Sequence, residues 1–261
     1  MAFTVHAVMP GVWHIVDCMG VCMTLLEGEN AAMLVDTGYG IEDVADFMRH
    51  MTDLPLTVFL THNHHDHAMG ARCFPETYML EADMADWDMF TNDKMRRRVL
   101  TQAIGKNLTV DEKTFLAGEI PLPKVMKPGV IDLGGLTAEI IEAPGHTPGS
   151  AVVYVPERKL LLSGDDWNPC TWLFFPQALG LREYRSNMRG IQQLPFEKVL
   201  CPHREALYDR WMFDDFFNAL TDGNLRAAEP VNIAPYEQID TCQATLPHEQ
   251  VFVFDWAKSG L

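Results

Sequence analysis

The segment Thr61–His67 concentrates side chains that bind metal ions, directly after the apolar run Leu56–Leu60. Its candidate ligands are His62, His64, Asp66 and His67. Imidazole nitrogens and a carboxylate suit zinc, and iron or manganese accept the same donors. In an extended chain His62 and His64 point to one side, and Asp66 and His67 fall in the turn that follows. The four residues could therefore bind two adjacent metal ions. His65 alternates away from its neighbours, and we expect it not to be a ligand.

Three later strand-like runs also end on possible ligands. His146 stands between two Pro-Gly pairs after the run Leu136–Ile141, Asp165 follows Leu160–Gly164, and His203 follows Lys198–Pro202. Loops at the ends of strands are where functional residues gather on a rigid sheet, so we expect these residues to meet the first cluster at one edge. Asp166 is an alternative to Asp165 for the carboxylate.

The order of these motifs resembles that of the metallo-beta-lactamase fold superfamily. The segment Leu34–Gly38 resembles the first of the family's five motifs, and the clusters described above resemble the other four. The resemblance implies one metal ion bound by His62, His64 and His146, and a second bound by Asp66, His67 and His203. It implies that Asp165 bridges the two ions. It also implies that Asp36 holds the metal-binding loop by hydrogen bonds without touching an ion.

Length, composition and patterning favour one domain over residues 1–261. The chain is 48% hydrophobic, which is enough for a substantial core. Strand-like runs alternate with helical spacing, as in residues 41–51 between two apolar runs. We expect an α/β fold, the four-layered αββα sandwich of two mixed β-sheets flanked by helices that the resemblance implies, with a helical insertion at about residues 81–120.

Charge and composition narrow the partners and the location. A formal net charge of -16 argues against nucleic acid, whose phosphates need clustered basic residues. The one dense basic run, Arg96–Arg98, is expected to be a solvated helix face paired with acidic residues such as Asp88 and Asp93. The sequence shows neither an export signal nor an apolar stretch long enough for a membrane span. We therefore expect a cytoplasmic protein that acts on a small molecule, with no membrane partner.

Two metal ions at such a site imply hydrolysis by a metal-bridging hydroxide, with Asp66 or Asp165 accepting or relaying the proton. We expect two divalent ions, zinc first, with manganese or iron as alternatives. Unlike secreted beta-lactamases, the chain has the bridging aspartate and no export signal. We expect an ester, lactone or thioester of an uncharged, partly apolar small molecule as substrate. Two alternatives remain: a mononuclear iron persulfide dioxygenase and a non-catalytic metal-binding protein.

The segment after Asp165 is rich in aromatic residues and should shape the pocket. We expect contacts to substrate from Trp167, Asn168, Trp172 and Phe175, with residues 81–120 as a lid. Asn168 stands where related lactone hydrolases place a tyrosine, and its amide could donate a hydrogen bond to a developing oxyanion as a catalytic group. Core packing, or a contact between two copies in a homodimer, would explain the aromatics equally well.

Overall fold

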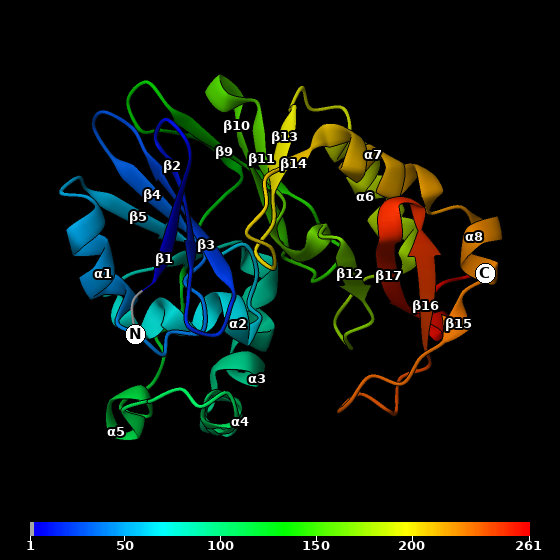
Figure 1. The fold of residues 1–261 in the computed structure, drawn as a ribbon, viewed down its shortest axis with the longest axis horizontal. Coiled ribbons are helices and arrows are strands. Elements are labelled where there is room, and N and C mark those ends of the chain that lie inside the picture. Colours follow the sequence, from blue (N-terminus) through cyan, green and yellow to red (C-terminus); the bar gives the residue numbers. More distant parts are fainter. Residues whose placement is uncertain (1–2) are drawn as a thin grey trace.

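The computed structural model describes residues 3–261 and contains three β-sheets (Figure 1). The strands of the first sheet are β1 (Thr4–Met9), β2 (Val12–Val16), β3 (Cys22–Glu27), β4 (Ala32–Val35), β5 (Leu56–Phe59), β6 (Tyr78–Met79) and β7 (Lys124–Val125). They lie in that order, antiparallel from β1 to β4 and parallel from β4 to β7.

The second sheet is also mixed. Its strands are β8 (Gly129–Asp132), β9 (Thr137–Glu142), β10 (Ala151–Val155), β11 (Leu160–Leu162), β13 (Lys198–Leu200) and β14 (Tyr208–Asp209). They follow the order β14-β13-β11-β10-β9-β8, and only β11 and β13 are parallel. The expected pair of mixed sheets is therefore confirmed.

Helices cover both sheets. The α-helices are α1 (Val44–Met51), α2 (His65–Ala68), α3 (Trp87–Thr91), α4 (Asp93–Gly105), α5 (Glu112–Phe115), α6 (Leu181–Ile191), α7 (Arg210–Ala219) and α8 (Asp222–Arg226). Short 3-10 helices are η1 (Met69–Cys73), η2 (Glu81–Asp86), η3 (Pro156–Arg158), η4 (Gly164–Asp166), η5 (Pro247–Glu249) and η6 (Trp256–Lys258). Within residues 3–261, no helix is both long and apolar enough to cross a membrane.

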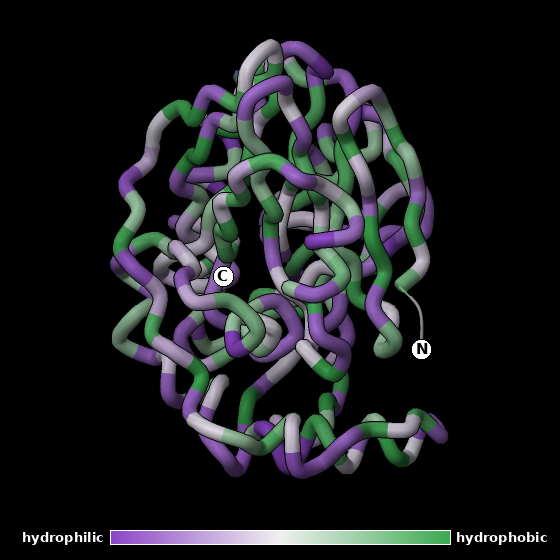
Figure 2. Tube along the Cα trace, turned by 90° about the vertical axis from the view of Figure 1, so that its left-hand side faces the viewer, coloured by the Kyte–Doolittle hydropathy of each residue, from purple (hydrophilic) through white to green (hydrophobic). Residues whose placement is uncertain are grey.

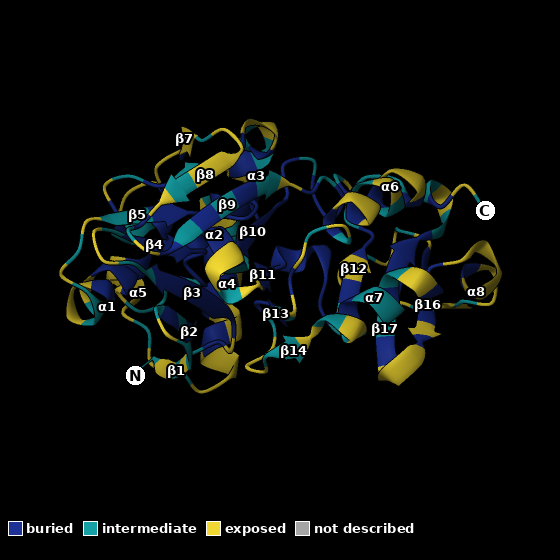
Figure 3. Cartoon of the chain, turned by 90° about the horizontal axis from the view of Figure 1, so that it is seen from above, coloured by how far each residue is buried: buried dark blue, intermediate teal, exposed yellow. Residues whose placement is uncertain are grey.

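The core is layered as the sandwich requires. Between the two sheets, Met33 and Phe59 of the first pack in one cluster with Val153 and Leu162 of the second. Helix α1 packs on the outer face of the first sheet, and α6 and α7 pack on the outer face of the second. The central strands are buried along most of their length (Figure 3). This arrangement confirms the expected αββα order.

A third sheet packs against α6 and α7 and was not expected. It consists of β12 (Cys170–Leu173), β17 (Gln250–Asp255), β16 (Thr241–Leu246) and β15 (Glu229–Pro230), in that order. Its aromatic residues pack against the helices, for example Phe252 against Tyr184 with ring centroids 5.9 Å apart. Pairing of β12 with β17 joins segments far apart in the sequence, so local patterns could not reveal it.

Helices η2, α3, α4 and α5 occupy the range in which a helical insertion was expected, and they lie at the bottom of Figure 1. Asn92 caps α4 by accepting a hydrogen bond from the Met95 amide. Trp87, Val99 and Leu100 bury their side chains in one cluster with Leu60, which immediately precedes the first histidine motif. Hydrophilic and hydrophobic residues alternate along this segment (Figure 2), since one face packs and the other is solvated.

Candidate metal centre and pocket

Four of the predicted ligands form one compact group. His62 and His64 lie between β5 and α2, His146 lies between β9 and β10, and Asp165 lies in η4 directly after β11. Each offers a ligand atom, and these atoms all lie within 4.8 Å of one another. Nδ1 of His64 and Nε2 of His146 are 2.9 Å apart. Three strand ends thus bring together residues separated by about a hundred positions in the chain, as the sequence predicted.

The other three predicted ligands form a second group, Asp66, His67 and His203. Nε2 of His203 lies 3.7 Å from Oδ2 of Asp66, and Nε2 of His67 lies 3.8 Å from the same oxygen. Asp66 and His67 belong to the short helix α2, and His203 follows β13. His65 joins neither group.

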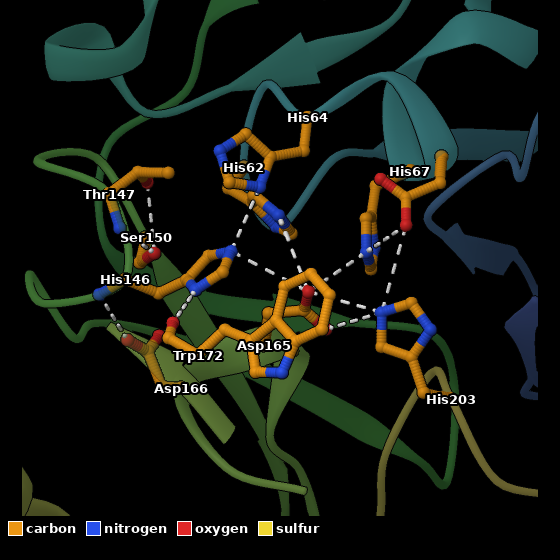
Figure 4. A network of polar contacts seen from close by, with 12 residues as sticks. His62, His64, His67, His146, Thr147, Ser150, Asp165, Asp166, Trp172 and His203 are labelled. Atoms are coloured by element: carbon orange, nitrogen blue, oxygen red, sulfur yellow. Dashed lines mark hydrogen bonds and ion pairs between the residues drawn. The ribbon is translucent and has the colours of Figure 1, made fainter. Parts of the chain in front are cut away.

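Asp165 stands between the two groups (Figure 4). Its Oδ2 is 3.5 Å from Nε2 of His146 in the first group and 3.4 Å from Nε2 of His67 in the second. Its Oδ1 is 3.0 Å from Nε2 of His203. One carboxylate therefore reaches both sets of imidazoles, which is the geometry that a bridging ligand needs.

The buried atoms of this centre fit divalent ions. Nε2 of His62 and Nε2 of His67 are buried without a hydrogen-bond partner. Burial lowers the pKa of His62, His64 and His146, which keeps these imidazoles in the neutral form that binds metal. Burial also disfavours the charged form of His67, but Asp165, Asp66 and Asp36 outweigh it and raise the pKa of His67 well above its usual value. The carboxylates therefore attract positive charge to this point.

Outer partners orient the imidazoles. Asp36 Oδ2 lies 3.0 Å from Nδ1 of His67, and Oδ1 of the same carboxylate accepts from the Thr61 amide at 2.7 Å. Nδ1 of His146 lies 2.7 Å from the carbonyl oxygen of Trp172. The contacts to His67 and His146 hold the ring nitrogen that faces away from the centre, and such contacts set ring orientation and tautomer. The predicted supporting role of Asp36 is confirmed by these bonds.

Gln177 completes this outer ring and was missed by sequence reasoning. Its amide group lies against His64, with one terminal atom 2.7 Å from Nε2 of the ring and the other buried without a partner. His64 presents Nδ1 to the centre, so the proton of the neutral ring belongs on Nε2, which then needs an acceptor. The amide orientation that satisfies this donor places Oε1 of Gln177 toward the ring. Gln177 then holds His64 through an Nε2–H···Oε1 hydrogen bond.

Two further buried carboxylates lie behind the centre. Asp166 accepts from the His146 amide at 3.1 Å, and burial raises its pKa well above the usual value. Asp166 is thus a support for the His146 loop, and the neighbouring Asp165 is the carboxylate between the ligand groups. Asp83 of η2 accepts from the Asn63 amide at 3.1 Å and from the Thr147 hydroxyl at 2.7 Å. It ties two ligand loops together, and no motif in the sequence marked it.

A cavity of about 460 Å³ opens over the metal centre. Its floor carries His64, Asp66, His146, Asp165 and His203, and the walls are Tyr39, His65, Phe90, Arg98, Gln102, Asn168, Cys170, Trp172, Phe175, Arg204, Ala234 and Tyr236. Phe90, Arg98 and Gln102 come from helices α3 and α4, so the segment expected as a lid does border the cavity.

The expected pocket residues divide between cavity and core. Trp172 and Phe175 line the cavity, but Trp167 is fully buried and packs against Phe213 in the core, with Nε1 donating to Gln250. The prediction for Trp167 was therefore wrong. Along β12 side chains alternate, so Trp172 faces outward while its neighbours Thr171 and Leu173 are buried.

Asn168 lines the cavity and is buried. Its Oδ1 accepts from the Cys170 amide at 2.8 Å, which closes a turn before β12. That bond leaves the Nδ2 hydrogens as the donors Asn168 can offer.

The basic run Arg96–Arg98 was predicted to be a solvated helix face paired with acidic residues, and the structure agrees only in part. Arg96 is buried and pairs with Asp93, and Arg97 lies 3.9 Å from Glu112, which fits a paired helix face. Arg98 instead lines the cavity. Helical spacing places it on the side of α4 that borders the pocket, and this depends on where α4 docks.

Comparisons with known proteins agree with the fold and the ligand groups described above. Residues 16–203 match the family model of the metallo-beta-lactamase superfamily. The chain therefore belongs to this superfamily, whose members are mostly hydrolases, and it is an enzyme of that class. The superfamily binds divalent metal ions, and this chain has two groups of His and Asp side chains that could hold them.

Particular relatives are distant. The chain is 26% identical over 202 residues to acyl-coenzyme A thioesterase MBLAC2 of Gallus gallus, covering 69% of this chain and 70% of that one. A metallo-beta-lactamase from Pontibacter korlensis is 18% identical with a TM-score of 0.60, covering 83% of this chain and 98% of the other. TTHA1623, solved in a di-iron-bound form, is 20% identical with a TM-score of 0.54, covering 76% and 94%. At these identities the structures show a shared fold.

Proposed function

We propose that this protein uses two divalent metal ions to hydrolyse an ester, lactone or thioester of a partly apolar small molecule. The observation that carries the proposal is Asp165, whose carboxylate contacts His146 of one ligand group and His67 and His203 of the other beneath an open cavity. Zinc is our first choice of ion because imidazole and carboxylate donors suit it. Iron is the main alternative, since a relative in fold was solved with two iron ions.

When bound, such ions supply Lewis acidity and lower the pKa of a coordinated water. The protein's own groups do the rest. Asp66 and Asp165 lie where they can accept a proton at a carboxylate oxygen. Asn168 can donate from Nδ2 to oxygen charge that develops in the transition state. These roles need no protein nucleophile.

The walls of the cavity favour an apolar acyl part. Phe175 packs within 4.6 Å of His64 and within 5.4 Å of both His146 and Tyr236, measured between ring centroids. Trp172, 36% exposed, extends this aromatic wall toward solvent. An apolar surface of this kind binds an aliphatic chain and excludes water from the reacting bond. The thioesterase relative supports the thioester branch in particular.

A mononuclear iron dioxygenase is the less favoured alternative. Such an enzyme needs only the first ligand group, whereas here Asp66, His67 and His203 are all present and converge. The same completeness argues against a non-catalytic metal-binding protein.

A substrate panel tests the proposal. Protein reconstituted separately with zinc, manganese and iron is assayed on esters, lactones, thioesters and phosphodiesters with matched acyl chains. We expect turnover of a carboxylic ester, lactone or thioester, rising with acyl chain length. Turnover of phosphodiesters alone, or oxygen consumption with a persulfide and one iron per chain, would contradict it.

A further inference from the structure

Two arginines line the cavity outside the metal ligands. Arg98 projects from α4, and Arg204 follows His203 directly. Both are solvent-exposed at the cavity wall. Arg204 donates from Nη1 to the backbone carbonyl of His203 at 2.7 Å, which holds its side chain beside the metal centre.

Neither arginine has an acidic partner among residues 3–261: no carboxylate oxygen lies within 4.0 Å of Arg98 or Arg204. The two residues before Arg98 on α4 show the contrast, because Arg96 pairs with Asp93 and Arg97 with Glu112. A guanidinium left unpaired beside a ligand cavity is free to bind an anion.

The balance of acidic and basic side chains in the cavity lining differs from that of the whole chain. The protein has 36 acidic and 20 basic residues. Among the residues lining this cavity, however, the only carboxylates are Asp66 and Asp165, both candidate metal ligands. Apart from the histidines, the remaining charged side chains there are Arg98 and Arg204. Placing two cations near bound divalent ions costs electrostatic free energy, which an anionic ligand would offset.

We infer that Arg98 and Arg204 bind an anionic group of the substrate, a carboxylate or a phosphate. The planar guanidinium donates two parallel hydrogen bonds that match either group. This inference rests on the proposed function and changes one part of the expectation from sequence: the substrate is not uncharged. Its apolar arm lies along Trp172 and Phe175, the cleavable bond lies over the metal centre, and the anionic group lies toward the arginines.

Binding of non-hydrolysable ligands tests the anion site separately from catalysis. Three hexyl thioethers share one apolar arm and differ in the other: N-acetylcysteamine is neutral, 3-mercaptopropionate carries a carboxylate, and coenzyme A carries phosphates. Isothermal titration calorimetry on zinc-reconstituted protein measures each dissociation constant. We expect at least one anionic thioether to bind about tenfold or more tightly than the neutral one, with a preference that weakens as salt rises. A preference for the coenzyme A ligand alone identifies phosphate as the anion, a preference for the mercaptopropionate ligand alone identifies a carboxylate, and a preference for both shows that the arginines accept either anion.

Variants assign the preference to the arginines. Arg98→Met and Arg204→Met should each weaken the anionic ligand about tenfold and leave the neutral one unchanged. Arg97→Met, on the same helix but outside the cavity lining, is the matched control and should change neither. Equal binding of all three thioethers, or a preference that survives in the double variant because the metal holds the anion, would overturn the inference. Hexanoyl thioesters of the same three thiols are assayed in parallel, so a preference without turnover refutes only the proposed hydrolysis, and turnover without a preference refutes only the anion site.

Discussion

At the scale of single residues, the centre depends on how protons and charges are shared among buried groups. Asp165 is 8% exposed, and although burial disfavours its charged form, His203 and His67 hold the pKa of its carboxyl well below the usual value. It therefore remains an anion between imidazoles on both sides. Removing it separates the two ligand groups, whereas removing His65 touches neither.

We accordingly expect Asp165→Ala and His146→Ala to abolish hydrolysis with the fold intact, and His65→Ala to leave most activity. Circular dichroism checks the fold, and steady-state kinetics on the best substrate of the panel measure the loss. An equal loss at His65 would show that the ligands in the histidine motif are wrongly assigned.

Gln177 acts one step further out, by holding His64. Gln177→Leu removes the acceptor for Nε2–H of His64 while keeping a similar volume, so we expect metal affinity to fall about tenfold to a hundredfold. Gln177→Glu keeps an acceptor and should retain most of the affinity. Competition with a chromogenic chelator measures both dissociation constants. Wild-type affinity in the leucine variant would mean that the amide contact does not orient the ligand.

Asn168 concerns turnover rather than metal binding. If its Nδ2 donates to the developing oxyanion, Asn168→Ala lowers kcat by about a hundredfold at unchanged metal content. The alanine variant also loses the Oδ1 bond to the Cys170 amide. Asn168→Asp keeps that bond but lacks the donor, and it should be equally slow. Near-normal kcat in the aspartate variant would limit Asn168 to closing the turn before β12.

At the scale of elements, loops at strand ends carry the ligands, and buried side chains fix those loops to one another. Asp83 of η2 accepts from the amide of Asn63 and the hydroxyl of Thr147, which belong to two different ligand loops. Its carboxylate also accepts from the Gly149 amide at 2.5 Å. A β-carbon at Gly149 would lie 2.6 Å from the Asp83 backbone nitrogen, so only glycine allows this close approach. Helix η2 is thus anchored to the edge that carries the candidate ligands.

Asp83→Ala leaves these donors without an acceptor in a buried place. We expect the free energy of unfolding to fall by about 2–3 kcal/mol, with weaker metal binding as a consequence. Urea unfolding measures the change, and Asp88→Ala, at an exposed position of α3, is the control. A decrease no larger than that of the control would show that η2 is held by its apolar contacts alone.

At the scale of the whole molecule, metal binding and stability are linked, because the buried ligands of two sheets meet only in the folded chain. Ions that bind the native state alone stabilise it by mass action, about 2.7 kcal/mol at a hundredfold excess over the dissociation constant. For a chain of this size that corresponds to a rise in Tm of roughly 5–10 °C.

We therefore expect the purified protein to hold up to two divalent ions and its Tm to fall by roughly 5–10 °C on treatment with a chelator. Elemental analysis and calorimetry measure the two quantities, and readdition of zinc should restore both. No more than one equivalent after reconstitution with zinc or manganese would contradict a dinuclear centre, and a single iron would favour the dioxygenase alternative.

The amino-acid sequence by itself determined the parts of this protein that depend on local order. His62, His64, Asp66 and His67 are close in the chain, and the strands before His146, Asp165 and His203 are visible as apolar runs. Because strand ends meet at a sheet edge, the order of residues along the chain was enough to expect these ligands to lie together, whereas their division into two sets came from the resemblance to the superfamily. The sandwich of two mixed sheets followed from the same patterns and from the resemblance to the superfamily.

Only the tertiary structure decided features that depend on contacts between distant segments. Trp172 faces the cavity because β12 pairs with β17, a register that the local sequence does not contain, and Trp167, which precedes β12, packs against Phe213 in the core. The docking of α4 turns Arg98, but not Arg97, toward the cavity. Gln177 and Asp83 belong to no motif, since a single hydrogen bond across the fold leaves no periodic signal. The ligands were predictable because the chemistry that binds a metal ion requires particular residue types, whereas the surroundings that orient them are set by packing.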